Sequence, residues 1–401
     1  MRIRPLFILL FFTLLVVLAG CLGSDSGNYL STPAERFQAS VDTNWMQYKQ
    51  THALPEGGVA VYVETPSGSY FASSGMPAGV NQNTHFRAGS NTKTFTAAAI
   101  MLLNQLGSLN IDDFITSNIP VKGIPYVPAT AAYNIPNKAS ITIRQLLSHT
   151  AGVFDISNQE VPSTCTCPYA GQSYISSVCA TDPNHQFSAD ELVGVIAACQ
   201  ISYFAPGGGY HYSNAGYWIL STIIERVSGM SYDQFVMNNL ITPNGLSSTT
   251  IPMLGTDQAI RAPFTPGYVY DGSAMTDATL ANQSPSVGSG NIISTPTDLA
   301  RWVRRLIRAE AGLNAASVAV MKTATPQSGS NKYGLGIFYV DRLGYGHNGA
   351  VSGYLSQMLY DPDSDVTTIV YFNVWDVPHL NPDQFALNVK IAQDAKAALG
   401  Y

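Results

Sequence analysis

Charge is scarce in this chain of 401 residues, because Asp, Glu, Lys and Arg together make up only 11% of it. The 20 basic residues are outnumbered by 26 acidic ones, which gives a formal net charge of −6 at pH 7. Arginines gather only along one expected helix, at positions Arg301, Arg304, Arg305 and Arg308. Proteins that bind nucleic acid present a basic patch to the phosphate backbone, and this sequence has none. We therefore expect no nucleic-acid partner.

Long apolar runs are also rare, and the single one covers residues 6–18. Elsewhere the chain has no apolar segment long enough to cross a bilayer. The run follows Arg2 and Arg4 and ends before Leu-Ala-Gly-Cys21, which is the pattern of a secretion signal. Because a cysteine stands directly after the small residues, residues 1–20 resemble a bacterial lipoprotein signal. That resemblance implies an exported protein held at the cell envelope by lipid on Cys21, with a plain signal peptide or an uncleaved membrane anchor as alternatives.

Cysteine is uncommon too, and four cysteines remain within one short region once Cys21 is set aside. An even number of cysteines in an oxidising compartment predicts two disulfides. Cys165 and Cys167 are too close in sequence to pair comfortably with each other, so we expect each of them to pair with Cys179 or Cys199. Four thiolates around a zinc ion are the alternative, which the lack of a Cys-x-x-Cys pair disfavours.

Two common catalytic patterns are missing. None of the seven histidines belongs to a His-Glu-x-x-His motif, so the sequence gives no sign of a zinc peptidase. A Gly-x-Ser-x-Gly elbow is also absent, which argues against an α/β-hydrolase. We expect neither a metal ion nor another cofactor.

Residues 21–35 are rich in Ser, Gly and Asn and predict a flexible tether, followed by a folded region over 36–401. Apolar and β-branched residues predict strands near both ends of that region, at 58–64, 70–71, 333–340, 355–360 and 367–373. Helical periodicity fills the middle and the last segment, 384–399. The fold class is therefore α/β of the α+β type. We expect an antiparallel sheet made by both chain ends (36–89 and 295–401), flanked by helices, with a mostly helical lobe inserted at 90–294.

Residues 86–95 read FRAGSNTKTF and contain the chain's single Ser-x-x-Lys match, Ser90 and Lys93. An apolar helical pattern begins here and ends at Gly107, so the two side chains lie on the same face of one helix. Uncharged surroundings predict a buried lysine, whose pKa falls because burial disfavours the charged form. A neutral lysine can accept the serine proton, and the helix N-terminus favours the resulting negative charge. The alternative is a serine that only caps the helix.

Tyr212 and Asn214 stand two residues apart, after the glycine-rich stretch 204–209 and just before a helical pattern. A phenol beside a lysine can act as general base and then as general acid to the leaving group. The amide of Asn214 can bind a substrate carbonyl, although a core tyrosine and a capping asparagine are the alternative. Tyr371 and Asn373 have the same spacing, but they lie within a strand pattern without a loop to present them, so we discount them.

Residues 346–350 read GHNGA and form a third motif. If this segment is an edge strand beside the site, Gly349 lets a substrate backbone approach, since it has no side chain to obstruct it. His347 would offer a hydrogen-bond donor to an acidic group of the substrate. A histidine in an ordinary turn is the alternative.

Together, the three motifs resemble the serine β-lactamase and penicillin-binding protein superfamily in residue type, order and spacing. The most similar branch contains class C β-lactamases, D-alanyl-D-alanine carboxypeptidases, and their esterase and D-aminopeptidase relatives. Residues 141–152 (ITIRQLLSHTAG) and 289–298 (SGNIISTPTD) resemble further segments of the same family. The resemblance extends over residues 36–399, nearly the whole of the expected domain.

The resemblance implies catalytic roles for three residues. Ser90 matches the acylated nucleophile, Lys93 its proton partner and Tyr212 the general base. The backbone N–H groups of Ser90 and Ala350 would form the oxyanion hole, because they would point at the oxygen of the tetrahedral intermediate.

Asn214, His347 and Gly349 match the substrate-binding positions of the family. Most class C β-lactamases have Lys-Thr-Gly where this chain has His347-Asn-Gly349. A lysine holds the drug's carboxylate with a permanent charge, whereas a histidine is only partly charged near neutral pH. The resemblance therefore implies weaker β-lactam binding. A loop at about 158–183, which carries three of the four cysteines, looks like an insertion near the substrate cleft.

These observations predict an exported, lipid-anchored serine hydrolase that forms an acyl-enzyme through Ser90. The expected substrates are D-amino-acid peptides or related amides, such as peptidoglycan stems, with weak action on β-lactams. Two alternatives remain: a carboxylesterase acting on small acyl esters, and a penicillin or peptidoglycan sensor that is acylated with little turnover. The expected partners are therefore a small-molecule or peptide substrate and, through the lipid anchor, a membrane.

Overall fold

The computed structural model describes residues 32–401. The predicted signal, the lipidation site Cys21 and most of the predicted tether lie outside the described residues, so these remain predictions. Within the part that is described, no helix is both long and apolar enough to cross a membrane.

The first helix, α1 (Pro33–His52), begins inside the range predicted as tether, 21–35. Thr32 and Glu35 form a reciprocal capping box, and Pro33 occupies the first helical turn. Both features start a helix whatever the composition of the residues before it. The folded part therefore begins earlier than predicted, which corrects the end of the tether.

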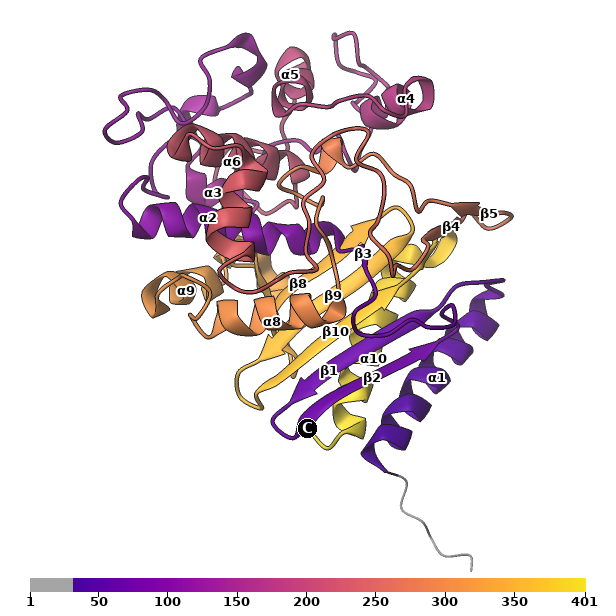
Figure 1. Cartoon of the computed structure of the whole chain (residues 1–401). Helices are drawn as coiled ribbons and strands as arrows, with labels where there is room; N and C mark the ends of the chain where they lie inside the picture. Colours follow the sequence, from indigo (N-terminus) through magenta and orange to yellow (C-terminus); the bar gives the residue numbers. More distant parts are fainter. Residues whose placement is uncertain (1–31) are drawn as a thin grey trace, which may run out of the picture.

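A six-stranded antiparallel sheet lies at the centre of the molecule, in the order β2-β1-β10-β9-β8-β7 (Figure 1). Its strands are β1 (Val59–Thr65), β2 (Gly68–Ser74), β7 (Phe338–Val340), β8 (Gly344–Val351), β9 (Tyr354–Asp361) and β10 (Val366–Phe372). Strand β1 pairs with β10 near the other end of the chain, with Val61 opposite Val370. The prediction of one sheet built from both chain ends is confirmed.

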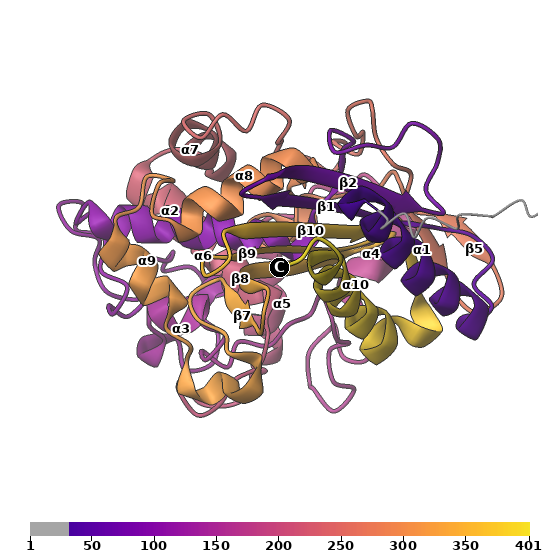
Figure 2. The ribbon, with the colours of Figure 1, turned by 90° about the horizontal axis from the view of Figure 1, so that it is seen from below.

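Helices cover both faces of this sheet (Figure 1, Figure 2). Helix α1 and α10 (Phe385–Ala398) pack together on one face, whereas α8 (Pro296–Ile307) and α2 (Thr92–Gln105) lie on the other. Side chains along β1 alternate between the two cores: Val61 packs with α1 and α10, and Tyr62 packs on the side of α2 and α8. Burial on both faces explains the nearly continuous apolar runs of the central strands.

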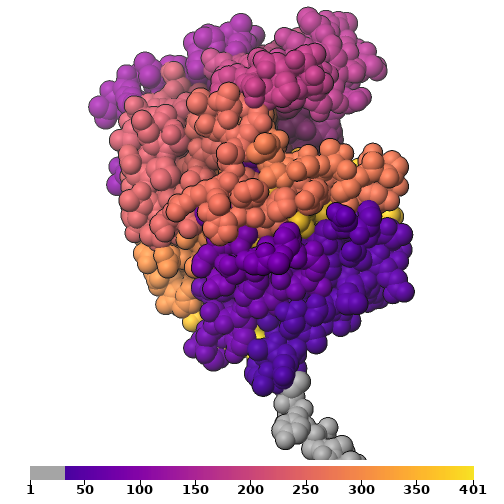
Figure 3. All heavy atoms as spheres, turned by 45° about the vertical axis from the view of Figure 1, so that its right-hand side comes forward, coloured from indigo at the N-terminus to yellow at the C-terminus, as the bar shows by residue number. Residues whose placement is uncertain are grey.

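A second lobe, mostly helical, lies above the sheet in Figure 1. After α2 its helices are α3 (Ile143–Leu147), α4 (Tyr174–Thr181), α5 (Ala189–Cys199), α6 (Asn214–Ser228) and α7 (Tyr232–Val236). Two short strands, β3 (Phe86–Arg87) and β6 (Ile293–Ser294), pair where the chain enters and leaves this lobe. In the space-filling view, the orange segment near the end of the lobe lies between the indigo N-terminal part and the magenta helices (Figure 3).

The inserted lobe is not helical throughout. Strands β4 (Tyr268–Tyr270) and β5 (Met275–Asp277) form a hairpin, and β4 also pairs with β11 (Val374–Asp376), which directly follows the main sheet. This small sheet ties the lobe to the C-terminal region. Helix α9 (Ala315–Lys322) follows α8 after the lobe has ended.

The strand predicted over 333–340 is shorter than expected, because only its last three residues form β7. Gly334 and Gly336 turn the chain before that strand. Gly336 has a φ of +70° and lies against α2, where a Cβ would be 2.3 Å from the Cβ of Ala97. Tyr333 forms an isolated bridge with Phe338 at the start of β7, so the chain turns back on itself over 333–337 and does not form one continuous strand, which corrects the prediction.

One disulfide forms, between Cys167 in the loop before α4 and Cys199 at the end of α5. This pairing is one of those predicted for Cys167, and it rules out a zinc ion held by all four thiolates. The second predicted disulfide does not form: within residues 32–401, Cys165 and Cys179 are free thiols. Both are half-buried and pack against the apolar core of the helical lobe, as cysteine does when it acts as a small apolar side chain. The prediction of two disulfides is therefore corrected to one.

Candidate active site

Ser90 lies where the sheet meets the helical lobe. The chain leaves β3, forms the 3-10 turn η1 (Gly89–Asn91) and continues directly into α2. Gly89 has a φ of +55°, and a Cβ there would lie 2.9 Å from the backbone nitrogen of Ala350 on β8. Glycine allows both this backbone conformation and this close approach. The contact holds Ser90 beside β8, at the N-terminus of α2.

Lys93 is fully buried one turn further along, and its Nζ lies 3.1 Å from Oγ of Ser90. The same nitrogen lies 2.6 Å from the side-chain oxygen of Asn214 and 2.7 Å from the backbone oxygen of Ser289. Burial lowers the pKa of Lys93 to about 7, and the charge of Asp155 opposes part of that shift. A neutral amine is therefore well populated at pH 7 beside the Ser90 hydroxyl.

Tyr212 completes this group, since its ring centroid lies 4.8 Å from Nζ of Lys93. Burial raises the pKa of the Tyr212 phenol well above its usual value, and a hydrogen bond with the Ser90 side chain opposes part of that shift. The phenol is therefore protonated at neutral pH. The structure brings together the predicted residues Ser90, Lys93 and Tyr212.

The second Tyr-x-Asn pair, Tyr371 and Asn373, lies away from this group, as expected. The Tyr371 ring is buried and stacks on Phe86 with 4.1 Å between ring centroids. The Asn373 side chain accepts a hydrogen bond from the backbone N–H of Gly58 at 2.7 Å. Both residues hold parts of the sheet region together.

Asn214 begins α6 and connects Lys93 to a buried carboxylate. Its Oδ1 accepts from Lys93, its Nδ2 donates to Oγ of Ser157 at 2.8 Å, and its backbone N–H donates to Asp155 at 2.9 Å. Asp155 is fully buried and also accepts from the backbone N–H and the hydroxyl of Ser157. Neither Asp155 nor Ser157 was predicted from the sequence. Their Asp-x-Ser spacing, which closes a turn by a side-chain to backbone bond, was the signal available.

His149 is a third site residue that was not predicted, although it lies within the 141–152 segment. Its Nδ1 accepts the backbone N–H of Ser213 at 3.1 Å, and its ring centroid lies 4.3 Å from that of Tyr212. Burial lowers the pKa of His149 well below 6.5, so the imidazole is neutral. It thus fixes the backbone next to Tyr212 without adding a charge to the site.

His347 is not placed as predicted. It is fully buried on β8, with Nε2 2.9 Å from the Tyr333 hydroxyl and Nδ1 2.5 Å from the backbone oxygen of Asn348. Because a carbonyl can only accept, Nδ1 donates to it and Nε2 accepts from Tyr333. Burial lowers the pKa of His347 to about 3, so the ring is neutral at pH 7. Both nitrogens are used within the protein, which corrects the prediction that His347 donates to an acidic group of the substrate.

Gly349 is required by a contact inside the protein. A Cβ at this position would lie 1.9 Å from the backbone oxygen of Ala88 and 2.7 Å from Oγ of Ser356. The interpretation that the missing side chain makes room for a substrate is therefore corrected: it makes room for the turn that carries Ser90. The same close packing sets Ala350 beside that turn, where the predicted oxyanion donors belong.

The outer part of β8 is an edge strand beside Ser90, as expected. Strand β7 pairs only with the first three residues of β8, 344–346. On the other side of β8, β9 pairs with residues 345–351. Among residues 32–401, no strand covers the remaining edge of β8. An extended peptide can pair with an edge of this kind through its backbone.

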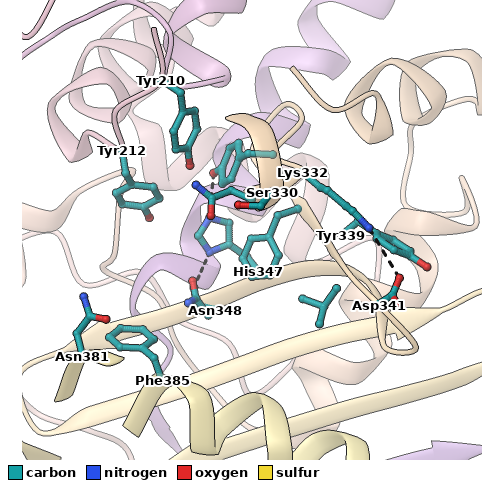
Figure 4. A pocket seen from close by; sticks show the side chains of 14 residues that line it. Tyr210, Tyr212, Ser330, Lys332, Tyr339, Asp341, His347, Asn348, Asn381 and Phe385 are labelled. Carbon is teal, nitrogen blue, oxygen red and sulfur yellow. Dashed lines mark hydrogen bonds and ion pairs between the residues drawn. The ribbon is translucent and has the colours of Figure 1, made fainter. Parts of the chain in front are cut away.

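A cavity of about 690 Å³ opens beside Tyr212 and His347 (Figure 4). Much of its wall is aromatic, formed by Tyr210, Tyr212, Tyr333, Phe338, Tyr339 and Phe385. Asn348 and Asn381 add side-chain amides. The one cation among the lining residues, Lys332, has its Nζ 3.7 Å from the carboxylate of Asp341. The cavity therefore offers apolar and amide surface with its positive charge already paired.

Comparison with known proteins identifies the family. Residues 46–393 match the family described as Beta-lactamase. The chain belongs to the Beta-lactamase family. Penicillin-binding protein 4* of Bacillus subtilis (strain 168) is 26% identical over 344 residues, which cover 82% of this chain and 68% of that protein. The chain spans 53% to 63% of the length of several other curated relatives.

Solved structures share the fold of this Beta-lactamase family member. A D-stereospecific amidohydrolase from Streptomyces sp. matches with a TM-score of 0.70 at 24% identity, over 85% of this chain and 94% of that chain. The D-amino acid amidase from Ochrobactrum anthropi SV3, complexed with D-phenylalanine, matches with a TM-score of 0.71 at 21% identity, over 92% and 99%. Family and fold together confirm the predicted superfamily, and with it a serine hydrolase of that family.

Proposed function

We propose that this protein is an exported, lipid-anchored hydrolase that cleaves D-amino-acid peptides or related amides through an acyl-enzyme on Ser90. The observation that carries the proposal is the 3.1 Å contact between Oγ of Ser90 and the amine of Lys93, whose pKa burial lowers to about 7. A penicillin-binding protein, a D-stereospecific amidohydrolase and a D-amino acid amidase among the similar proteins support the substrate class.

Lys93 acts as the base that activates Ser90. A neutral amine has two N–H bonds and one lone pair. The two N–H bonds can go to the oxygens of Asn214 and Ser289, at 2.6 and 2.7 Å. The lone pair is then left for the Ser90 hydroxyl, whose proton it accepts as Oγ bonds to the substrate carbonyl carbon.

Tyr212 acts as the acid that releases the leaving group, and not as the base that the family resemblance implies, because burial raises its pKa and keeps the phenol protonated. The oxyanion formed by the attack is held by the backbone N–H groups of Ser90 and Ala350. As the C–N bond breaks, the protonated phenol of Tyr212 gives its proton to the departing nitrogen, and the proton held by Lys93 then restores the phenol. In deacylation, a water molecule loses a proton to Lys93 and its oxygen attacks the acyl carbonyl carbon. The bond from that carbon to Oγ of Ser90 then breaks, and Lys93 returns the proton to Oγ.

The cavity beside Tyr212 favours a leaving group without a charge. Its aromatic wall binds apolar groups, and its amides can bind neutral ones. A substrate carboxylate would need a free cation, but His347 is neutral and Lys332 is paired with Asp341. We therefore expect neutral amides to be better substrates than β-lactams or peptides that end in a free carboxylate, because neither carboxylate has a charged partner here. The same neutral cavity makes a carboxylesterase the second candidate.

The test compares the purified protein with its Ser90→Ala variant on five compounds. These are D-phenylalanine amide, L-phenylalanine amide, a D-Ala-D-Ala peptide, a p-nitrophenyl ester and a fluorescent penicillin. Ser67→Ala, which changes an exposed serine in the β1–β2 turn, is the matched control. We expect turnover of the D-amide or the D-peptide, a loss of about 10⁴-fold or more in Ser90→Ala, and no change in Ser67→Ala.

Each other outcome has a distinct meaning. Turnover of the ester alone would support the carboxylesterase and contradict the amidase. Labelling by penicillin that persists without turnover would favour a sensor. Equal rates on D- and L-phenylalanine amide would contradict the proposed preference for D-amino-acid substrates. If Ser90→Ala kept the wild-type rates, the acyl-enzyme on Ser90 would be wrong.

Export and lipidation are tested separately, by fractionating cells and analysing the N-terminal peptide by mass spectrometry. We expect the protein in the membrane fraction with lipid on Cys21, and the Cys21→Ala variant to lose both lipid and membrane association. Recovery of unlipidated wild-type protein from the soluble fraction would contradict the anchor.

A further inference from the structure

Two histidines and two aspartates from distant parts of the chain meet outside the candidate active site. His52 is the last residue of α1, and Asp376 is the last residue of β11. His379 and Asp383 lie in two short turns, η7 (Val377–His379) and η8 (Leu380–Gln384), which lead into α10. None of the three catalytic motifs includes these residues.

The donor atoms of His52, Asp376 and His379 all lie within 4.8 Å of one another. Nδ1 of His379 is 3.1 and 3.0 Å from the two carboxylate oxygens of Asp376. The rings of His52 and His379 lie against each other at a tilt of 43°, with 4.1 Å between their centroids. A carboxylate oxygen of Asp383 lies 4.0 Å from Nε2 of His52. The cluster therefore offers two imidazoles and two carboxylates.

We propose that His52, Asp376 and His379, with Asp383 as a fourth ligand, bind a divalent transition-metal ion, of which zinc fits best. Zinc binds imidazole nitrogen and carboxylate oxygen at about 2.0–2.2 Å, which in a tetrahedron sets neighbouring donors about 3.4 Å apart. The three closest donors must therefore approach one another by no more than about 1.4 Å. The binding ion takes the place of the proton that Nδ1 of His379 shares with Asp376.

Asp376 is the fixed part of the site. It has no exposed surface, its Oδ2 accepts from the Tyr48 hydroxyl at 2.9 Å, and its backbone N–H donates to Gln384 at 3.1 Å. Bonds of this kind orient the carboxylates that bind metals. The side chains of His379 and Asp383 are 35% and 50% exposed, so an ion can enter from solvent.

An ion pair between Asp376 and His379 accounts for only part of this arrangement, because His52 and Asp383 add donors that the pair does not need. A bound ion uses all four side chains. It would also join the first helix to the segment that carries Asn381, a residue of the cavity wall. The ion would thereby brace one side of the candidate substrate cavity, without taking part in the chemistry at Ser90.

The experiment titrates chelator-treated purified protein with Zn²⁺ by calorimetry, and follows thermal unfolding with and without the ion. We expect one zinc ion per chain and a rise in Tm of a few degrees at saturating zinc. Both His52→Gln and His379→Gln should lower the zinc affinity at least about tenfold. Asp383→Asn should lower it less, because Asp383 lies outside the group of three whose donors are all within 4.8 Å of one another.

The matched control is His185→Gln. His185 lies 2.9 Å from Glu191 and 3.9 Å from Asp182, so it is an imidazole between carboxylates without a second histidine. This variant should bind zinc as the wild type does, and so should Ser90→Ala, which separates the result from the proposed hydrolase activity. The proposal would be overturned if the wild type bound no zinc, or if His52→Gln and His379→Gln bound it as tightly as the wild type.

Discussion

The amine of Lys93 lies among three oxygens, those of Ser90, Asn214 and Ser289, and none of them belongs to a carboxylate. A contacting carboxylate would have kept the lysine charged. Burial instead lowers its pKa to about 7, and Asp155 opposes this only as a more distant charge. Lys93 can therefore gain or lose its proton within the pH range in which most enzymes work.

We predict that kcat/KM rises as the pH increases from about 5.5 to about 8, with a midpoint near the Lys93 pKa of about 7. Below the midpoint the amine is protonated and cannot accept the Ser90 proton, whereas above it the lone pair is free. Initial rates on a neutral amide substrate across this range measure the effect. Lys93→Arg stays charged and should lose about 10³-fold or more at every pH. A flat profile would show that another group accepts the proton.

Residue type, order and spacing were enough to predict that Ser90, Lys93 and Tyr212 lie together, whereas their catalytic roles stay predictions. They were not enough for His347. Whether the His347 ring faces a substrate or the core depends on Tyr333. The hydroxyl of Tyr333, which lies in a neighbouring loop, donates to Nε2 of His347. No local pattern in the sequence shows that contact.

At the scale of elements, the decisive contact is between strand β8 and the turn η1. It depends on two glycines, Gly89 in the turn and Gly349 in the strand, at which a Cβ would come within 2.9 and 1.9 Å of the facing backbone. The two glycines are far apart in the sequence, and each belongs to a different motif. The contact between them could therefore not be predicted from either motif alone.

We predict that Gly349→Ala lowers both activity and stability. The added Cβ overlaps the backbone oxygen of Ala88, so β8 and the turn that carries Ser90 must move apart. We expect at least a tenfold loss of kcat/KM and about 1–3 kcal/mol of unfolding free energy. Amide hydrolysis and urea unfolding measure these. The control is Gly194→Ala in α5, where a Cβ would lie 3.7 Å from Ala132. Wild-type activity in Gly349→Ala would mean that the turn tolerates the shift.

Elements were predicted well where a long pattern and a clear end coincide, as in β1, β9 and β10. Helix α1 was missed although Thr32 and Glu35 carry a capping box, because the polar stretch before it masked the signal. The segment 333–337 was predicted as strand because it is rich in apolar residues, but the chain turns there, at Gly334 and Gly336, before β7 begins. Buried segments are apolar whether they form strands or turns, so an apolar run alone does not identify the element.

At the scale of the whole molecule, strand patterns at both chain ends and helices between them were sufficient for the overall architecture. The small sheet that joins β4 and β5 to β11 was not predicted, since strands of three residues leave almost no pattern. The disulfide partner of Cys167 could not be chosen from the sequence, because Cys179 and Cys199 are both far enough along the chain to pair with it.

We predict that the double variant Cys167→Ser, Cys199→Ser loses about 2–4 kcal/mol of unfolding free energy, because the bridge restricts the unfolded chain over 32 residues. Urea unfolding of the purified, oxidised protein measures this loss. The double variant Cys165→Ser, Cys179→Ser changes free thiols and should have a smaller effect. If the two double variants lost equal stability, the single bridge between Cys167 and Cys199 would be contradicted.

Strand β1 finds its inner neighbour, β10, only near the end of the chain. While the ribosome is still making the middle of the protein, the edge of β1 that later pairs with β10 therefore has no partner strand. Unpaired edges invite aggregation, and distant pairing is slow. A chain released before β8 to β10 are synthesised would contain Ser90 and Lys93 but lack β8, the strand that positions the turn carrying Ser90. Such incomplete chains would therefore have no hydrolase activity.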